Sequence, residues 1–138
     1  MERTLVLVKP DGVSRGLVGE IIRRFENRTL DIKALKITKP CRELVEKHYE
    51  VHRGKPFFEG VVRFMSSGPV VAMVLEGENA IEQVRRMMGA LDPLAAQPGT
   101  IRGDYTLSTK ENLVHGSDAV ESAEREIAVW FAPDEVLD

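Results

Sequence analysis

The sequence predicts an α+β fold in which helices pack on one face of a small sheet. Short apolar segments typical of buried strands alternate along the chain with segments whose apolar residues recur at helical spacing. The chain has 138 residues, of which 43% are hydrophobic and 30% are charged, with no low-complexity tract. This is the balance of a folded protein and the length of one domain. We therefore expect a single domain over residues 1–138, with one functional site.

Three segments have the composition of strands. Residues 4–8 (TLVLV) and 70–75 (VVAMVL) are apolar without polar alternation, as expected for strands that are covered on both faces. Residues 31–37 place Lys33 and Lys36 at solvent-facing positions, which predicts a strand that is partly exposed.

The helical segments are separated by turn and capping signals. Asn79 is expected to cap one helix and Gly89 to end it, while Asp118 and Glu121 form a predicted capping pair for the last helix. The expected helices cover residues 17–25, 40–49, 56–65, 79–88 and 118–131.

No periodicity is visible from residue 90 to about residue 114. A connection of this length inside a compact domain tends to be functional. A fourth strand is also expected in this part of the chain, and the pattern leaves residues 105–107 and 113–115 open as alternatives.

Charge and composition exclude several function classes. The net charge of -3 gives no general attraction to nucleic acid or to anionic lipid, so phosphate binding requires a local cluster of cations. Cys41 is the only cysteine, which excludes an intramolecular disulfide, and we interpret it as a helix-start residue. No apolar run could span a bilayer, and residues 1–3 (MER) do not resemble a signal peptide. We therefore expect a cytoplasmic protein with no membrane partner.

His115 is the main candidate for a chemical role. It lies between an apolar pair and a turn just before the last expected helix, so its surroundings should hold it in place. A largely neutral imidazole can attack phosphorus and release it again, as a phosphoryl relay requires. Glu126, near the inner stripe of the last helix, could fix the tautomer of His115 by bonding one ring nitrogen. The alternatives are a structural loop histidine and a carboxylate that pairs with Lys or Arg.

Phosphoryl transfer also needs positive charge around the transferring group, usually with a magnesium ion. Lys9, Arg85 and Arg102 each lie beside a rigid element, although singly such residues are more often solvated surface charges. The glycines after the first strand lack the spacing of a P-loop or of a dinucleotide fold. His48 and His52 stand four residues apart, as zinc ligands do, but no third ligand is evident, so we interpret them as surface histidines.

Several motifs of this sequence together resemble the nucleoside diphosphate kinase family, in the family's order and over the whole chain. They are residues 9–12 (KPDG), 16–21 (GLVGEI), 48–49 (HY), 55–58 (KPFF), 67–72 (SGPVVA), 98–104 (PGTIRGD), 112–118 (NLVHGSD) and 122–127 (SAEREI). The resemblance implies a ferredoxin-like βαββαβ core with an antiparallel four-stranded sheet and the fourth strand near His115. It also implies a homo-oligomer, either a tetramer or a hexamer.

The same resemblance implies a ping-pong reaction in which the γ-phosphoryl group passes from a nucleoside triphosphate to a diphosphate through a phosphohistidine at His115. The implied substrates are ATP, GTP, ADP, GDP and their deoxy forms, with Mg²⁺ bound through their phosphates and no specific nucleic acid. The implied catalytic residues are His115, Glu126, Ser117, Tyr49 and Lys9. The implied nucleotide-binding residues are Lys9, Phe57, Arg85, Leu91, Arg102 and Asn112, with Phe57 stacked on the base. No side chain is implied as a metal ligand.

The sequence departs from the family's pattern at two places. Leu91 stands where the family usually has a threonine that contacts phosphate, which predicts weakened activity. Residues 28–29 (RT) replace the glycine that usually ends the first helix, which should affect stability only. Two other functions stay open. A non-catalytic regulatory or assembly subunit is supported by Leu91 alone, and an RNA-binding ferredoxin-like module is disfavoured because the strands carry aliphatic rather than aromatic residues.

Overall fold

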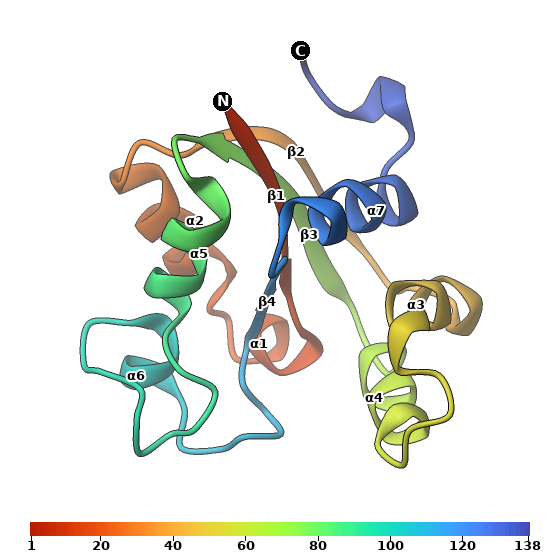
Figure 1. Ribbon diagram of the computed structural model, residues 1–138. Helices are drawn as coiled ribbons and strands as arrows, with labels where there is room; N and C mark the ends of the chain where they lie inside the picture. The colour runs from red at the N-terminus through yellow and green to blue at the C-terminus, as the bar shows by residue number, and fades with distance from the viewer.

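A four-stranded antiparallel sheet forms the centre of the structure, a computed structural model that describes residues 1–138 (Figure 1). The strands are β1 (Glu2–Val8), β2 (Asp31–Thr38), β3 (Val70–Gly77) and β4 (Val114–Gly116). The helices are α1 (Pro10–Ser14), α2 (Val18–Asn27), α3 (Arg42–His48), α4 (Phe58–Met65), α5 (Ala80–Met88), α6 (Ile101–Tyr105) and α7 (Val120–Trp130). Two short 3₁₀ helices complete the set, η1 (Glu50–His52) and η2 (Pro133–Glu135).

The strands lie in the order β2-β3-β1-β4, and every neighbouring pair is antiparallel. The central strand β1 pairs with β3 from Glu2 to Val8, and with β4 from Val6 to Val8. This is the α+β, ferredoxin-like arrangement that the family resemblance implied. The fourth strand is the later of the two alternatives, since Tyr105 instead ends helix α6.

Helices cover both faces of the sheet, so the prediction of helices on one face is wrong. Val6 and Val8 of β1 point into one core, which contains residues of α2, α5 and α6. Leu5 and Leu7 point into a second core with residues of α3, α4 and α7. Because successive side chains of a strand point to opposite faces, an apolar strand without alternation needs cover on both sides.

Helices α1 and α6 were not expected from the sequence. Each has only five residues, which is too short for an apolar stripe to repeat. Helix α6 is stabilised at its start by Thr100, whose hydroxyl accepts a hydrogen bond from the backbone N–H of Gly103 at 3.0 Å. The long irregular segment therefore contains one helix that carries Arg102. None of the helices has the length and apolar character needed to cross a membrane.

The predicted helix caps are only partly correct. Gly89 ends α5 with a φ of 89°, a left-handed conformation that suits glycine. Asn79 does precede α5, but its side chain makes no capping hydrogen bond. The N-cap of α7 is Ala119, which also lacks a side-chain cap, so the capping pair of Asp118 and Glu121 is wrong.

We predict that Gly103→Ala destabilises the protein by about 1–3 kcal/mol, because the new methyl group would overlap the backbone carbonyl of Gln97. Gly60→Ala is the matched control, since a Cβ at this helical position meets no atom within 4 Å. The control should gain about 0.5–1 kcal/mol. Urea unfolding measures both changes, and an unaltered midpoint for Gly103→Ala would contradict the prediction.

Candidate active site

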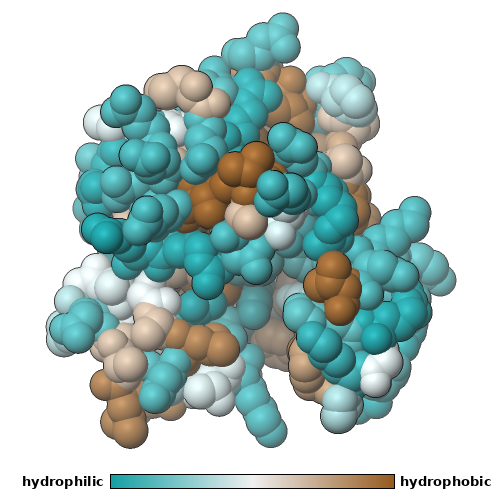
Figure 2. All heavy atoms as spheres, in the orientation of Figure 1, coloured by the Kyte–Doolittle hydropathy of each residue, from teal (hydrophilic) through white to brown (hydrophobic).

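A cleft of about 550 Å³ opens beside strand β4. One wall is formed by residues of α5 and α6, and the other by residues of α3 and α7. The space-filling view shows a largely hydrophilic face that is hollowed between these two sides of the molecule (Figure 2). Basic and acidic side chains dominate the lining, so the cleft suits a charged ligand rather than an apolar one.

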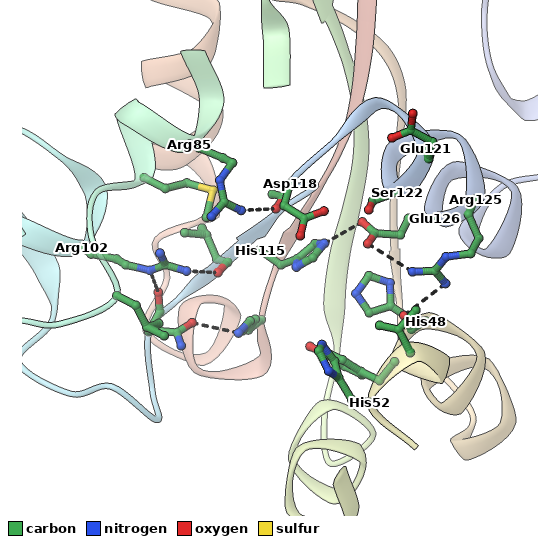
Figure 3. A pocket seen from close by; sticks show the side chains of 18 residues that line it. His48, His52, Arg85, Arg102, His115, Asp118, Glu121, Ser122, Arg125 and Glu126 are labelled. Atoms are coloured by element: carbon green, nitrogen blue, oxygen red, sulfur yellow. Dashed lines mark hydrogen bonds and ion pairs between the residues drawn. The ribbon is translucent and has the colours of Figure 1, made fainter. Parts of the chain in front are cut away.

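His115 lies on β4, opposite Leu7 of the central strand, and its side chain faces the cleft with 20% of its surface exposed. Its Nε2 atom lies 2.8 Å from Oε1 of Glu126 on α7 (Figure 3). A carboxylate only accepts hydrogen bonds, so Nε2 carries the proton and Nδ1 keeps its lone pair. The pair that the sequence suggested is therefore in contact, and it leaves one ring nitrogen free.

Glu126 is fixed by more than its contact with His115. Its side chain is 7% exposed, and Oε1 also accepts the hydroxyl of Ser117 at 2.7 Å. Arg125 lies 3.6 Å from its other oxygen. Ser117 is fully buried, so its position in the structure is that of a partner of Glu126. A buried carboxylate with several partners has little freedom to rotate. The orientation of the His115 imidazole is therefore fixed by its hydrogen bond to Glu126.

Arg102 holds the backbone that leads into β4. This guanidinium, which is 9% exposed, donates to the carbonyl oxygens of Asn112 at 3.2 Å, Val114 at 2.9 Å and Gly89 at 3.0 Å. Burial, with a further contribution from the charge of Arg85, lowers the pKa of Arg102 to about 10. Arg102 therefore places a positive charge in the cleft wall while it joins the end of α5 to the start of β4.

Leu113 is held in an unfavourable backbone conformation just before β4. Its φ is 75°, in the left-handed region that disfavours a leucine by roughly 1–2 kcal/mol. The turn after β1 compensates, because Lys9 N–H donates to Leu113 O at 2.8 Å and Leu113 N–H donates to Asp11 Oδ2 at 3.0 Å. Asp11 is 7% exposed. No role was predicted for Asp11, because a partner 102 residues away leaves no signal in the local pattern.

Two more predicted cations lie in the same cleft. Lys9 Nζ donates to Asn112 Oδ1 at 2.8 Å, and Arg85 Nη1 donates to the carbonyl of Gly116 at 3.3 Å. Burial, with a smaller contribution from Arg102, lowers the pKa of Lys9 to about 8, and the charge of Asp11 opposes this shift. Three basic side chains, from the turn after β1 and from α5 and α6, thus line the cleft together with His115.

The interpretation of His48 as a surface histidine is wrong. Its side chain is almost completely buried, lines the cleft, and packs edge-to-face on His115 with 4.6 Å between the ring centres. His52 is half-buried at the cleft rim, and its Nδ1 lies 3.2 Å from Lys55 Nζ. Tyr49 also lines the cleft, where burial raises the pKa of its hydroxyl.

Two of the predicted nucleotide-binding residues are largely exposed. Leu91 lines the cleft with 52% of its surface exposed, on the same side as Met88. Phe57 is 50% exposed and lies outside the cleft lining, 5.2 Å from the ring of His52. Its ring is therefore available for stacking at the outer edge of the site.

One group of three side chains has the composition of a metal site, namely His48, His115 and Glu126. Three of their hydrogen bonds disfavour a metal. Glu126 Oε1 already accepts two hydrogen bonds, and Nδ1 of His48 accepts the indole N–H of Trp130 at 3.0 Å. The bond from Trp130 leaves the proton of His48 on Nε2, so neither nitrogen of His48 offers a lone pair to a metal ion.

The whole chain is similar to known proteins. The family model described as Nucleoside diphosphate kinase matches residues 2–136. A nucleoside diphosphate kinase from Caldanaerobacter subterraneus subsp. tengcongensis is 61% identical over 137 residues, which cover 99% of this chain and 98% of that protein. One from Thermus thermophilus is 58% identical over 137 residues, with coverage of 99% and 100%.

Solved structures give the same result. A halophilic nucleoside diphosphate kinase from Halobacterium salinarum in complex with CDP has a TM-score of 0.95 and 52% identity, covering 99% of this chain and 91% of that one. The nucleoside diphosphate kinase from Aquifex aeolicus has a TM-score of 0.95 and 45% identity, with 99% coverage of both chains.

We predict that Lys9→Met raises the free energy of unfolding at pH 7 by about 1–2 kcal/mol, because it removes a half-buried, poorly solvated charge and loses only one hydrogen bond to Asn112. The unfolded chain keeps the Lys9 proton up to about pH 10.5, whereas the folded protein releases it near pH 8. The folded state therefore binds fewer protons between these values, and the native protein gains stability relative to the variant as the pH rises from 8 to 10.5.

Urea unfolding of both proteins at several pH values measures this difference. A variant that is less stable at pH 7, or a difference that does not change with pH, would contradict the assignment of a strained positive charge at Lys9.

Proposed function

Because this chain belongs to the nucleoside diphosphate kinase family, we propose that it transfers the γ-phosphoryl group between nucleotides through a phosphohistidine at Nδ1 of His115. The observation that carries this proposal is the bond from His115 Nε2 to the buried Glu126, which leaves Nδ1 free in a cleft lined by cations. The family consists of phosphotransferases, and this pairing is what a reversible nitrogen nucleophile requires.

In the first half-reaction a nucleoside triphosphate binds with its γ-phosphorus beside His115. The lone pair of Nδ1 forms the N–P bond, while the bond from phosphorus to the bridging oxygen breaks and its electron pair stays on the departing diphosphate. No proton has to leave Nδ1. The positive charge that develops on the ring is stabilised by Glu126, which keeps the hydrogen bond from Nε2–H.

The second half-reaction is the reverse with a different nucleotide. The diphosphate leaves, another nucleoside diphosphate enters, and its terminal phosphate oxygen attacks the phosphorus as the N–P bond breaks. The electron pair of that bond returns to Nδ1. Lys9, Arg85 and Arg102 surround the transferring group and offset its negative charge in both directions. Tyr49 lines the same cleft, and Ser117 holds Glu126 in place.

Magnesium fits this site as an ion that arrives with the nucleotide. Asp118 and Glu121 are the carboxylates in the lining that are not bonded to His115, and a hydrogen bond from Ser122 keeps the pKa of Asp118 below its usual range. These two are the side chains that would hold Mg²⁺, mainly through water, while the phosphates supply the other ligands. The ion would neutralise charge on the phosphate oxygens.

The substrates proposed are ATP, GTP, ADP, GDP and their deoxy forms. Phe57 is proposed to stack on the base, which its half-exposed ring supports, and stacking does not distinguish one base from another. Asn112, held by Lys9, is proposed to contact the nucleotide together with Arg102. The structure of the Halobacterium salinarum relative in complex with CDP supports a nucleotide as the ligand.

We also propose that residues 1–138 act as one domain in a cytoplasmic homo-oligomer, a tetramer or hexamer. The edge strand β2 exposes Leu35 and Ile37 by 49% and 64%. Exposed aliphatic residues on a sheet edge favour association with a second copy.

We expect the wild-type protein to become labelled by [γ-³²P]ATP, and His115→Asn to lose both the label and nucleotide exchange. The label should be labile in acid and stable in alkali, as phosphoramidate chemistry requires. Ser14→Ala, outside the cleft, is the control for folding and labelling. A wild-type protein that binds ATP without phosphoenzyme or exchange would instead support a non-catalytic subunit.

Leu91→Thr is predicted to raise kcat/KM about fivefold, because a hydroxyl at this position of the cleft restores one neutral hydrogen bond to phosphate, worth about 1 kcal/mol. Leu91→Val, which has the same branched shape without the hydroxyl, is the control. Steady-state exchange kinetics measure the effect, and an unchanged or lower kcat/KM in the threonine variant would refute it.

A further inference from the structure

His48 is the aromatic ring in closest contact with His115, and the reaction described above does not use it. It is the last residue of α3, and its ring meets the ring of His115 at an interplanar angle of 78° (Figure 3). The carbonyls of Lys47 and His48 accept hydrogen bonds from Arg125 Nη1 at 3.2 and 3.4 Å. The end of α3 is therefore fastened to α7, the helix that carries Glu126.

The tautomer of His48 is determined by Trp130. The indole Nε1–H of Trp130 donates to Nδ1 of His48 at 3.0 Å, and both side chains are buried. An indole nitrogen can only donate, so Nδ1 of His48 carries no proton. The ring is then neutral, and its hydrogen lies on Nε2. Burial lowers the pKa of His48, and the neighbouring His115, Arg125, Lys9 and His52 lower it further.

Nε2 of His48 opens on the cleft. It has no hydrogen-bond partner in the chain. It is also not one of the fully buried side-chain atoms that lack a partner, which are Thr4 Oγ1 and Asp11 Oδ1, so Nε2 is accessible from the cleft. His48 also belongs to the cleft lining. An N–H group with no protein acceptor, beside a nucleophilic ring, is placed to donate to a ligand bound there.

We propose that His48 Nε2–H donates a hydrogen bond to the phosphoryl group on His115, and that Trp130 is the positioning residue that keeps the proton on Nε2. This inference rests on the proposed phosphohistidine chemistry. A neutral donor binds the phosphoryl oxygens without adding a further charge next to the three cations. Because the donor is fixed before the substrate arrives, no reorientation is needed during transfer.

The test compares His48→Phe, which keeps a ring without the donor, with His48→Gln, which restores an N–H near the position of Nε2. Rapid-quench measurement at saturating ATP should show phosphoenzyme formation roughly tenfold to hundredfold slower in the phenylalanine variant. The glutamine variant should stay within a few-fold of wild type. KM for the nucleotide should change little, because His48 contacts only the transferred group.

Two further variants separate this role from simple packing. Val45→Ala removes a buried side chain of the same helix, away from the cleft, and should lower stability while the transfer rate per folded enzyme stays unchanged. Trp130→Phe should slow transfer several-fold, and ¹⁵N NMR of His48 should change from a single Nε2–H tautomer to a mixture.

Wild-type transfer rates in folded His48→Phe, or a proton found on Nδ1 of His48 in the native protein, would overturn the inference. An equal loss in the phenylalanine and glutamine variants would also overturn it, because that result indicates a packing role. If the native protein forms no phosphoenzyme at all, the proposed function itself fails, and this outcome is distinguishable since it does not depend on any variant of His48.

Discussion

The position of His115 depends on a strand that cannot hold itself in place. Strand β4 has three residues and pairs only with β1, so its own ladder supplies few hydrogen bonds. The guanidinium of Arg102 binds two carbonyls at its start, and the carboxylate of Asp11 binds the N–H of Leu113. Charged groups make stronger hydrogen bonds than neutral ones. These bonds stabilise β4 where its short ladder with β1 supplies few.

The arrangement of the cleft residues lowers the free energy of unfolding. Arg102 is buried, Lys9 is half-buried near it, and the backbone of Leu113 is strained, so the cleft holds mutually repelling positive charges and an unfavourable backbone conformation. Such features persist when the surrounding structure fixes them, and they concentrate at functional sites. A phosphate group that binds here would relieve the repulsion, which makes the same cations stabilising in the complex.

The sequence predicts the parts of this fold whose signals are local. The apolar runs of β1 and β3 and the stripe of α2 with Ile21 and Phe25 are visible in it, and they agree with the structure. Helix α6 has five residues and strand β4 has three, which is too short for a periodic pattern to be recognised, so only the family resemblance placed the fourth strand. The burial of His48 could not be predicted, because its partner Trp130 lies 82 residues away. The role of Glu126 as a partner of His115 could be predicted, because its position near the apolar stripe of the last helix points toward the interior.

The two walls of the cleft differ in how they are joined to the rest of the molecule. Arg125 of α7 donates to the carbonyls of Lys47 and His48, so hydrogen bonds join the end of α3 to α7 in the wall with His48 and Glu126. The opposite wall continues into residues 89–100, where Leu91 and Leu94 are exposed and few side chains are anchored. Segments with few buried contacts have the lowest free energy of local unfolding. The wall that continues into residues 89–100 is therefore the one expected to adjust when a ligand enters the cleft, while the hydrogen bonds that join His115, Ser117 and Glu126 persist.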